Sequence, residues 1–357
     1  MSRTTTARSA GAGARHRSRA RNPLLALLLT VAVAFGLVAC GGDGAADGDR
    51  SSAGFEPITI THALGTAEIT SKPERVVTLG QGSTETAIAL GVVPVATERY
   101  EWGADDSGYL PWIKEAVEKQ GAELPALIKG QDELSAEEVA KYKPDLILAP
   151  WSGVTAEQYK QLSAIAPTVV YEKEPWTITW EGQIDVVATA LGEKDRAREL
   201  KDGILTEFEK ASEPAYQDVT FSYIYNMGTP DQLGVFMPTE QRVEFLTKLG
   251  LKLDPVVEEF KDNVKAGTDS AELSQENLDK LDGSDLIFTF YSDDAQRTLM
   301  HEDPFYSAIP AIKKGAEVSL ADQSLVTASS MINPLTVPWA MDRYKEKIDE
   351  AIAASKR

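Results

Sequence analysis

The chain has 357 residues, which is long for one hydrophobic core and fits two domains of about 150 residues each behind a leader. Hydrophobic residues make up 43% of the sequence and charged residues 25%, the balance of a soluble globular protein rather than of a disordered one. The formal net charge of −19 argues against a nucleic-acid-binding protein, which needs a basic face to neutralise phosphates.

Residues 1–39 have the pattern of a bacterial signal peptide. Six arginines and no acidic residue lie within positions 1–21, and they precede an apolar run from Leu24 to Ala39 that only Thr30 and Gly36 interrupt. A run of this length is short for a transmembrane helix and suits the hydrophobic region of a signal peptide. Without this leader, 30 basic residues remain against 55 acidic ones, a formal net charge of about −25 that keeps a secreted protein soluble.

The leader ends in the sequence LVACG at 37–41, which resembles a bacterial lipobox and identifies Cys40 as the lipidation site. Cys40 is the only cysteine in the sequence, so neither an intrachain disulfide nor a cysteine-based metal site can form. The alternative is a plain signal peptide or membrane anchor with an incidental cysteine. Lipidation would place the mature protein on the extracytoplasmic face of the cell membrane, and we expect it there as a monomer.

Residues 40–55 are rich in Gly, Ala, Asp and Ser and predict a disordered tether. The alternation at 58–65 then predicts an edge strand or hairpin. Within 56–192, apolar strand patterns alternate with helical ones and predict a first α/β lobe with a mainly parallel sheet. We expect strands at 75–79, 92–97, 145–149 and 168–171, and helices at 83–90, 111–119, 136–142, 156–165 and 180–191.

A long helix is expected to join this lobe to a second one. Apolar residues recur on one helical face between 193 and 213, and Pro214 ends the segment. The alternation of strands and helices resumes in 214–357, which predicts a second lobe of the same kind. Its expected strands are 219–225, 232–237, 285–291 and 317–321, and its expected helices are 242–249, 275–281, 304–313 and 338–354. The predicted fold class is therefore α/β, with two Rossmann-like lobes joined by one long helix.

A weak internal repeat relates the two lobes. Leu-Ser-Ala-Glu at 134–137 and Leu-Ser-Gln-Glu at 273–276 each precede a helical stretch and then an Asp-Leu-Ile sequence. Serine with a nearby glutamate is also close to a helix N-capping pattern, so capping alone is an alternative explanation of Glu137 and Glu276.

The order of several short motifs resembles the iron-siderophore and vitamin B12 family of periplasmic binding proteins, whose two α/β lobes are bridged by one long helix. The matching segments are SKPERVVTL at 71–79, TETAIALGVVPV at 84–95, KPDLIL at 143–148, IAPTV at 165–169 and DPFY at 303–306. The resemblance implies a solute-binding lipoprotein without a cofactor, which carries an iron(III)-siderophore complex to an ABC permease dimer with its ATPase. It also implies that Glu137 and Glu276 dock on that permease, one from each lobe.

Ligands of α/β proteins bind beyond the carboxyl ends of the strands, and the loops predicted there are rich in aromatic residues and arginine. Such a lining suits a bulky ferric chelate, with arginine contacting the chelating oxygens. The candidate ligand-binding residues are Arg99, Tyr100, Trp102, Trp151, Tyr171, Trp176, Tyr225, Met227, Arg242, Tyr291 and Arg297.

Direct metal binding is not expected, because the three histidines of the sequence form no cluster with carboxylates. Cobalamin and haem remain alternative ligands, with His301 as the candidate haem ligand. A secreted hydrolase is the alternative from another class, although the sequence has no Gly-x-Ser-x-Gly, phosphate-loop or His-Glu-x-x-His motif.

Overall fold

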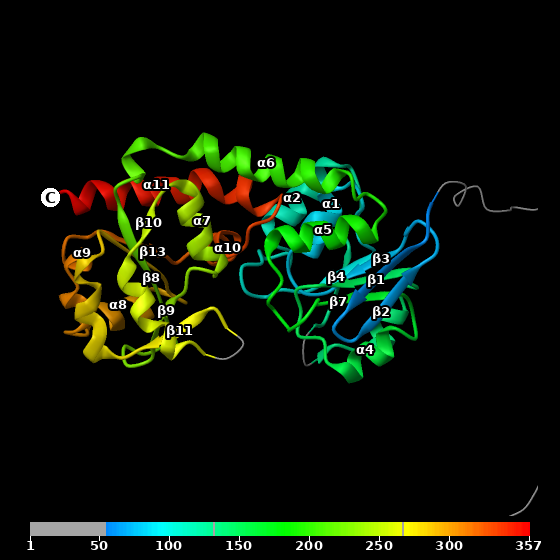
Figure 1. Cartoon of the computed structure of the whole chain (residues 1–357), viewed down its shortest axis with the longest axis horizontal. Coiled ribbons are helices and arrows are strands. Elements are labelled where there is room, and N and C mark those ends of the chain that lie inside the picture. Colours follow the sequence, from blue (N-terminus) through cyan, green and yellow to red (C-terminus); the bar gives the residue numbers. More distant parts are fainter. Residues whose placement is uncertain (1–54, 131–132, 266–267) are drawn as a thin grey trace, which may run out of the picture. The chain divides into compact units, whose positions relative to one another are not determined.

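A computed structural model describes residues 55–357 except 131–132 and 266–267 (Figure 1). The predicted leader, the lipidation site Cys40 and nearly all of the tether lie outside the described residues. The described chain begins with an antiparallel hairpin, as the alternation predicts, formed by β1 (Ile58–His62) and β2 (Gly65–Ile69). No helix in the described ranges is both long and apolar enough to cross a membrane.

The first sheet is entirely parallel, with the order β5-β4-β3-β6-β7. Its central strands are buried throughout, which is why they read as continuous apolar runs in the sequence. The strands are β3 (Val76–Thr78), β4 (Ala96–Glu98), β5 (Ala126–Ile128), β6 (Leu146–Ala149) and β7 (Thr168–Val170). We call this sheet, its helices and the hairpin the first lobe.

The helices of the first lobe follow the predicted ranges closely, although most end a few residues earlier than expected. They are α1 (Ser83–Ala89), α2 (Pro111–Lys119), α3 (Ala136–Ala140), α4 (Ala156–Leu162) and α5 (Trp180–Ala190). Side chains at the N-termini explain several of the starting points. Thr155 and Gln158 form a reciprocal capping box before α4, and Thr179 caps α5.

Helix α6 (Arg196–Ala211) leads from the first lobe to the second and packs against α5, α7 and α11 (Figure 1). Its buried face consists of Ala197, Ile204, Phe208 and Ala211, at the spacing that predicted it. The short helix η2 (Pro214–Tyr216) follows directly, because proline cannot continue the preceding turn.

The second sheet has the order β11-β9-β8-β12-β13, with β10 also paired to β8, and it is mixed rather than mainly parallel. Strands β8, β10, β12 and β13 pair in parallel, whereas β9 pairs antiparallel with both of its neighbours, β8 and β11. Only residues 227–232 connect β8 to β9, which is too short for the crossover that a parallel pair needs. The strands are β8 (Thr220–Asn226), β9 (Leu233–Phe236), β10 (Lys252–Leu253), β11 (Ser270–Leu273), β12 (Leu286–Phe290) and β13 (Glu317–Leu320).

The helices of this second lobe include several that the sequence patterns did not predict, among them α8 and α10. The predicted helix at 275–281 is a 3-10 helix, and the one at 304–313 is divided into η5 and α9. The elements are α7 (Gln241–Leu249), η3 (Pro255–Asn263), η4 (Gln275–Gly283), α8 (Asp294–Glu302), η5 (Tyr306–Ala308), α9 (Pro310–Lys313), α10 (Gln323–Ser329) and α11 (Thr336–Ser355).

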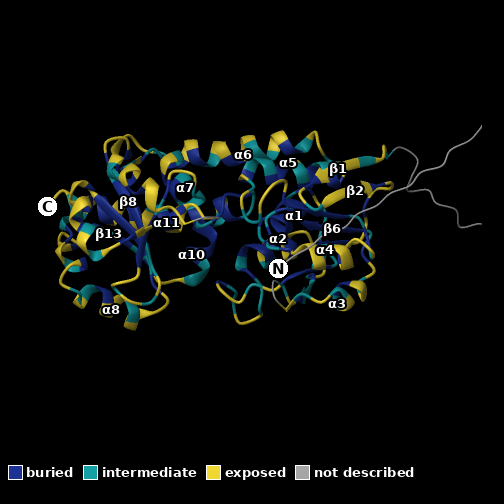
Figure 2. Cartoon of the chain, turned by 60° about the horizontal axis from the view of Figure 1, so that its bottom comes forward, coloured by how far each residue is buried: buried dark blue, intermediate teal, exposed yellow. Residues whose placement is uncertain are grey.

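Buried apolar residues run without a break from one lobe to the other, while a second cluster lies on the other face of the first sheet. Figure 2 shows the buried residues on the strands and on the inner sides of the helices. Besides α6, the indole rings of Trp112 on α2 and Trp339 on α11 connect the lobes, with their ring centroids 5.4 Å apart. The fold class is the predicted one, and both sheets share in one continuous core.

Candidate functional site

A cavity of about 890 Å³ lies between the two lobes. This volume falls within the range of about 300–1,000 Å³ that is usual for pockets that bind small molecules. The first lobe contributes Trp151, Glu174, Pro175, Trp176 and Thr177, and the second contributes Phe236, Glu240, Thr268, Asp269 and Ser270. We refer to this cavity as the cleft.

Two tryptophans form the wall of the cleft on the first lobe. Trp151 follows β6 and Trp176 follows β7, so both lie beyond the carboxyl ends of parallel strands. Their ring centroids are 4.6 Å apart at an interplanar angle of 71°, an edge-to-face pair. Gly153 makes room for this pair, because a Cβ there would lie 2.7 Å from the Trp176 ring.

Trp176 also has a strained backbone. Its φ of 66° lies in the left-handed region, where a bulky residue is an outlier that costs about 1–3 kcal/mol. The folded chain therefore holds this residue in an unfavourable conformation at the wall of a cavity. Such strain is concentrated at sites where a side chain must point in one direction.

The wall on the second lobe is built around Phe236, at the end of β9. Its neighbour in the sheet is Ser270 of β11, which brings the residues before β11 to the cleft. The ring of Phe236 lies 4.9 Å from that of Tyr225, and the guanidinium of Arg242 lies 4.8 Å above it. Aromatic and cationic groups therefore share one surface.

Arg242 and Glu240 form an ion pair at the start of α7. A guanidinium N–H of Arg242 donates to Oε1 of Glu240, while its backbone N–H donates to Oε2 at 2.6 Å. Burial raises the pKa of the Glu240 carboxyl, and Arg242 partly offsets this effect. The Nε atom of Arg242 is buried and has no hydrogen-bond partner among the described residues, so this arginine keeps donor capacity.

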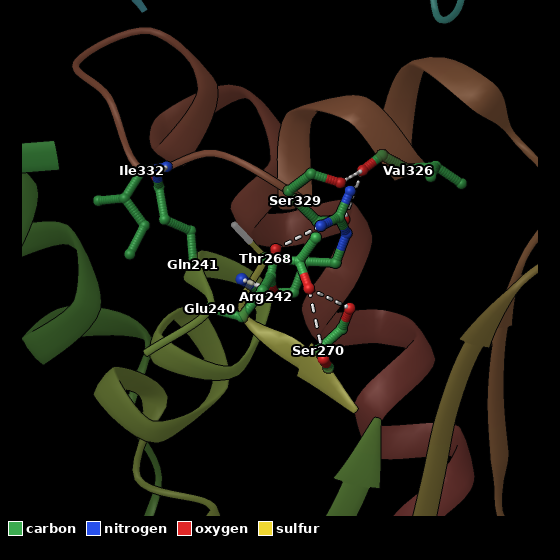
Figure 3. Close-up of polar contacts among 9 residues, drawn as sticks. Glu240, Gln241, Arg242, Thr268, Ser270, Val326, Ser329 and Ile332 are labelled. Carbon is green, nitrogen blue, oxygen red and sulfur yellow. Dashed lines mark hydrogen bonds and ion pairs between the residues drawn. The ribbon is translucent and has the colours of Figure 1, made fainter. Parts of the chain in front are cut away.

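The beginning of α7 is fixed from behind by Gln241, whose Oε1 accepts the backbone N–H of Ile332 at 2.9 Å (Figure 3). Thr268 and Ser270 line the same wall as Glu240, and the Thr268 hydroxyl lies 3.1 Å from that of Ser270 (Figure 3). The Thr268–Ser270 pair and the Glu240–Arg242 pair thus each fix part of this wall.

The two lobes also touch through the segment that follows β4. The hydroxyl of Ser324 on α10 donates to the carbonyl of Gly103 at 2.8 Å, and that of Thr327 donates to the carbonyl of Trp102 at 3.4 Å. Gly103 has a φ of +86°, and a Cβ there would lie 2.5 Å from Oγ1 of Thr327, so this contact requires glycine. The contact ties the lobes together by a route other than α6.

A second cavity of about 670 Å³ lies within the second lobe, at the carboxyl end of β8. Tyr225 and Met227 line it, and Met227 is 61% exposed. Lys265 and Glu272 face each other on its rim at 3.5 Å. Since the Tyr225 ring packs on Phe236, the two cavities adjoin the same aromatic pair.

Of the predicted ligand-binding residues, Trp151 and Trp176 line the cleft and Arg242 borders it through Glu240 and Phe236. Arg99 and Trp102 are exposed on the segment after β4, where Arg99 pairs with Glu101 at 3.6 Å. Neither lines a cavity described above.

Tyr100 differs from its neighbours Arg99 and Trp102, because its hydroxyl is buried and has no partner within the described chain. Burial raises the pKa of this phenol well above its usual value, and the nearby Glu98 and Glu85 raise it further. The ring packs against the main core. We therefore do not place Tyr100 in the cleft.

Three further candidates lie elsewhere. Tyr171 is only 6% exposed, and its hydroxyl donates to the carbonyl of Val154 at 3.1 Å. Tyr291 is fully buried and donates to Oε1 of Glu317 at 2.6 Å. Arg297 lines a separate cavity of about 280 Å³ beside β13 and α11. The two tyrosines belong to the core, where both rings are buried and both hydroxyls have partners.

The sequence patterns missed several residues of the cleft, namely Glu174, Phe236, Glu240, Thr268, Asp269 and Ser270. Glu174 and Glu240 lie close in sequence to the candidates Trp176 and Arg242, but the prediction considered only aromatic, arginine and methionine side chains. The short strand β11 was not predicted, so nothing in the sequence brought 268–270 to the site.

The two glutamates of the internal repeat are both exposed. Ser135 caps α3 by accepting the backbone N–H of Glu138, so Glu137 is not needed for capping. Glu276 lies at the start of η4, on the rim of a shallow cavity that includes Phe305. Neither carboxylate has an ion pair or hydrogen bond to another described residue, which leaves both available to a partner.

His301 lies on α8, where its Nε2 is 2.9 Å from Oε2 of Glu317. Among residues 55–357, apart from the four that are not described, no group of three or more His, Cys, Asp or Glu side chains is arranged to hold a metal ion.

Two α/β lobes joined by a helix, with an aromatic cleft between them, define a solute-binding protein. The sequence model of the periplasmic binding protein family matches residues 76–323, and the chain belongs to this family. Proteins of this family bind solutes for ABC transporters and are not enzymes.

Three similar proteins describe the relationship further. The chain is 27% identical to the probable siderophore-binding lipoprotein YfiY of Bacillus subtilis, over 76% of this chain and 83% of YfiY. It is 26% identical to the ferric enterobactin-binding periplasmic protein FepB of Escherichia coli, over 75% of this chain and 85% of FepB. The structure of Streptococcus pneumoniae PiaA in complex with ferrichrome matches with a TM-score of 0.74 and 29% identity, over 83% of this chain and 99% of PiaA.

Proposed function

We propose that this protein binds an iron(III)-siderophore complex in the cleft and delivers it to an ABC importer for iron uptake. The observation that carries the proposal is the cavity of about 890 Å³ with the Trp151 and Trp176 pair on one lobe and Phe236 with Arg242 on the other. The names of YfiY, FepB and PiaA, each of which refers to a siderophore or its iron complex, support it.

The cleft suits such a ligand for physical reasons. A ferric chelate is bulky and rigid, with apolar spacers around a polar iron centre, so it needs flat apolar walls and a few directed donors. The two tryptophans provide the flat surface, and such aromatic side chains lose little conformational entropy when a ligand binds. Arg242 stacks on Phe236 beside the cleft and adds a cation to this wall, although its charge is paired with that of Glu240.

A titration of tryptophan fluorescence tests the proposal. We expect at least one ferric siderophore to quench the emission of the purified protein with a Kd at or below the micromolar range, while haem and cobalamin do not. Trp151→Leu should weaken binding by about two- to tenfold, because it removes the edge-to-face contact with Trp176, which is worth about 0.5–1.5 kcal/mol. If haem or cobalamin alone bound, or if no ferric chelate did, the proposal would be wrong.

The docking function of Glu137 and Glu276 is part of the same proposal. Carboxylates in the two lobes can meet arginines of a permease dimer, and such pairs are short, charge-assisted contacts. We expect Glu137→Ala and Glu276→Ala to bind the chelate normally and to lose iron uptake in cells. Glu157→Ala, an exposed glutamate in the first turn of α4, is the matched control and should transport normally. A loss of chelate affinity in either docking variant would contradict this assignment.

The arrangement on the membrane completes the proposal. The lipid on Cys40 and the tether at 40–55 keep the protein on the extracytoplasmic face, beside the permease and its ATPase. We propose boundaries of 56–192 for the first lobe, 193–213 for the bridging helix and 214–357 for the second lobe, and a monomer as the active form. The contacts of Gly103 with α10 support a cleft that closes little on binding.

A further inference from the structure

The charges that line the cleft are all negative. Glu174, Glu240 and Asp269 are among its lining residues, and no lysine or arginine is. Arg242 lies beside the cleft, but its charge is paired with that of Glu240. Glu174 and Asp269 therefore remain without a compensating cation, since neither has an ion pair with another described residue.

The two uncompensated carboxylates lie on opposite walls. Glu174 belongs to the first lobe, in the loop after β7, and Asp269 belongs to the second, directly before β11. The hydroxyl of Thr239 donates to Oδ1 of Asp269 at 2.7 Å, which fixes that carboxylate. Both residues are exposed. A ligand that spans the cleft thus meets a negative group at each side.

We infer that the cleft selects a ferric tris-hydroxamate that carries a free ammonium group, which the negative charges of Glu174 and Asp269 attract. Three hydroxamates balance the three charges of iron(III), so the chelate core is neutral and fits the aromatic walls. A ferric tris-catecholate, with a net charge of −3, would be repelled by the same carboxylates. The inference rests on the proposed function and specifies the chelate.

A matched pair of ligands tests this inference. Ferrioxamine B carries an ammonium group, whereas its N-acetylated form has the same iron core and no charge. We expect the wild-type protein to bind ferrioxamine B about three- to tenfold more tightly at low ionic strength, because exposed ion pairs contribute modestly. The preference should shrink at high salt, since exposed charges are screened there.

Substitution then locates the effect. The double variant Glu174→Gln, Asp269→Asn should bind the two forms with equal affinity. Glu172→Gln, which removes a nearby exposed carboxylate outside the cleft lining, is the matched control and should keep the preference. Ferric enterobactin should bind most weakly of the chelates.

The outcomes separate the inference from the proposed function. Equal affinity of the wild type for both ferrioxamine forms, or tighter binding of ferric enterobactin, would overturn the inference and leave siderophore binding intact. A preference that survives in the double variant would also overturn it. If none of the ferric chelates bound, the proposed function itself would fail.

Discussion

Gly153→Ala tests the role of the Trp151 and Trp176 pair without substituting either tryptophan. Gly153 lies outside the left-handed region, so alanine fits its backbone. The new Cβ would stand 2.7 Å from Cζ2 of Trp176, whereas ordinary contact begins at 3.4 Å, so the indole must move by about 0.7 Å. This shift breaks the edge-to-face contact with Trp151, which is worth about 0.5–1.5 kcal/mol. We expect the Kd for the chelate to rise by about two- to tenfold.

The assay is a fluorescence titration, combined with near-ultraviolet circular dichroism to confirm that the indole pair has moved. Gly203→Ala on α6 is the control, because nothing lies within 4 Å of its new Cβ. It should bind normally and be slightly more stable, as alanine is the better helix former. If Gly153→Ala changed the dichroism and left the Kd at the wild-type value, Trp176 would not be part of the ligand wall.

Two further predictions concern stability. Burial raises the pKa of the Glu85 carboxyl above its ordinary 4.5. Between the pKa of the unfolded chain and the higher pKa of the folded state, the folded state holds a proton that the unfolded chain releases. The free energy of unfolding therefore falls as the pH rises through this range. In thermal unfolding, Glu85→Gln, which keeps an oxygen facing the Trp112 indole, should gain stability relative to wild type as the pH rises above 4.5. A difference that did not change with pH would refute this. Trp180→Phe removes the indole N–H that donates to Oε1 of Glu244 in the other lobe at 2.9 Å. We expect calorimetry to show a Tm that is lower by about 2–6 °C. An unchanged Tm would show that this hydrogen bond does not contribute to stability.

Local patterns predicted much of the fold correctly. Apolar runs fixed the buried strands β3 and β6 to within a residue, because a strand covered on both faces is apolar throughout. The helical spacing from Ala197 to Ala211 located α6 for a similar reason. Short elements with half-polar sequences, such as β11 and α10, escaped prediction because pairing with distant segments stabilises them.

The cleft was predicted less well than the fold. Trp151 and Trp176 were found because large aromatic residues after parallel strands are a strong signal. Tyr171 and Tyr291 carry the same signal, yet they fill the core, where the Val154 carbonyl and the Glu317 carboxylate accept hydrogen bonds from their hydroxyls. A tyrosine at a strand end can turn either way, and only its neighbours in space decide which.

The sequence by itself determined the alternation of strands and helices and the position of the bridging helix α6. Each of these rests on residues close together in the chain, where spacing alone specifies the local structure. The tertiary structure decided that β9 and β11 run antiparallel and bring Asp269 opposite Glu174. Residues from distant segments meet only through packing, so the charge of the cleft could not be read from the sequence.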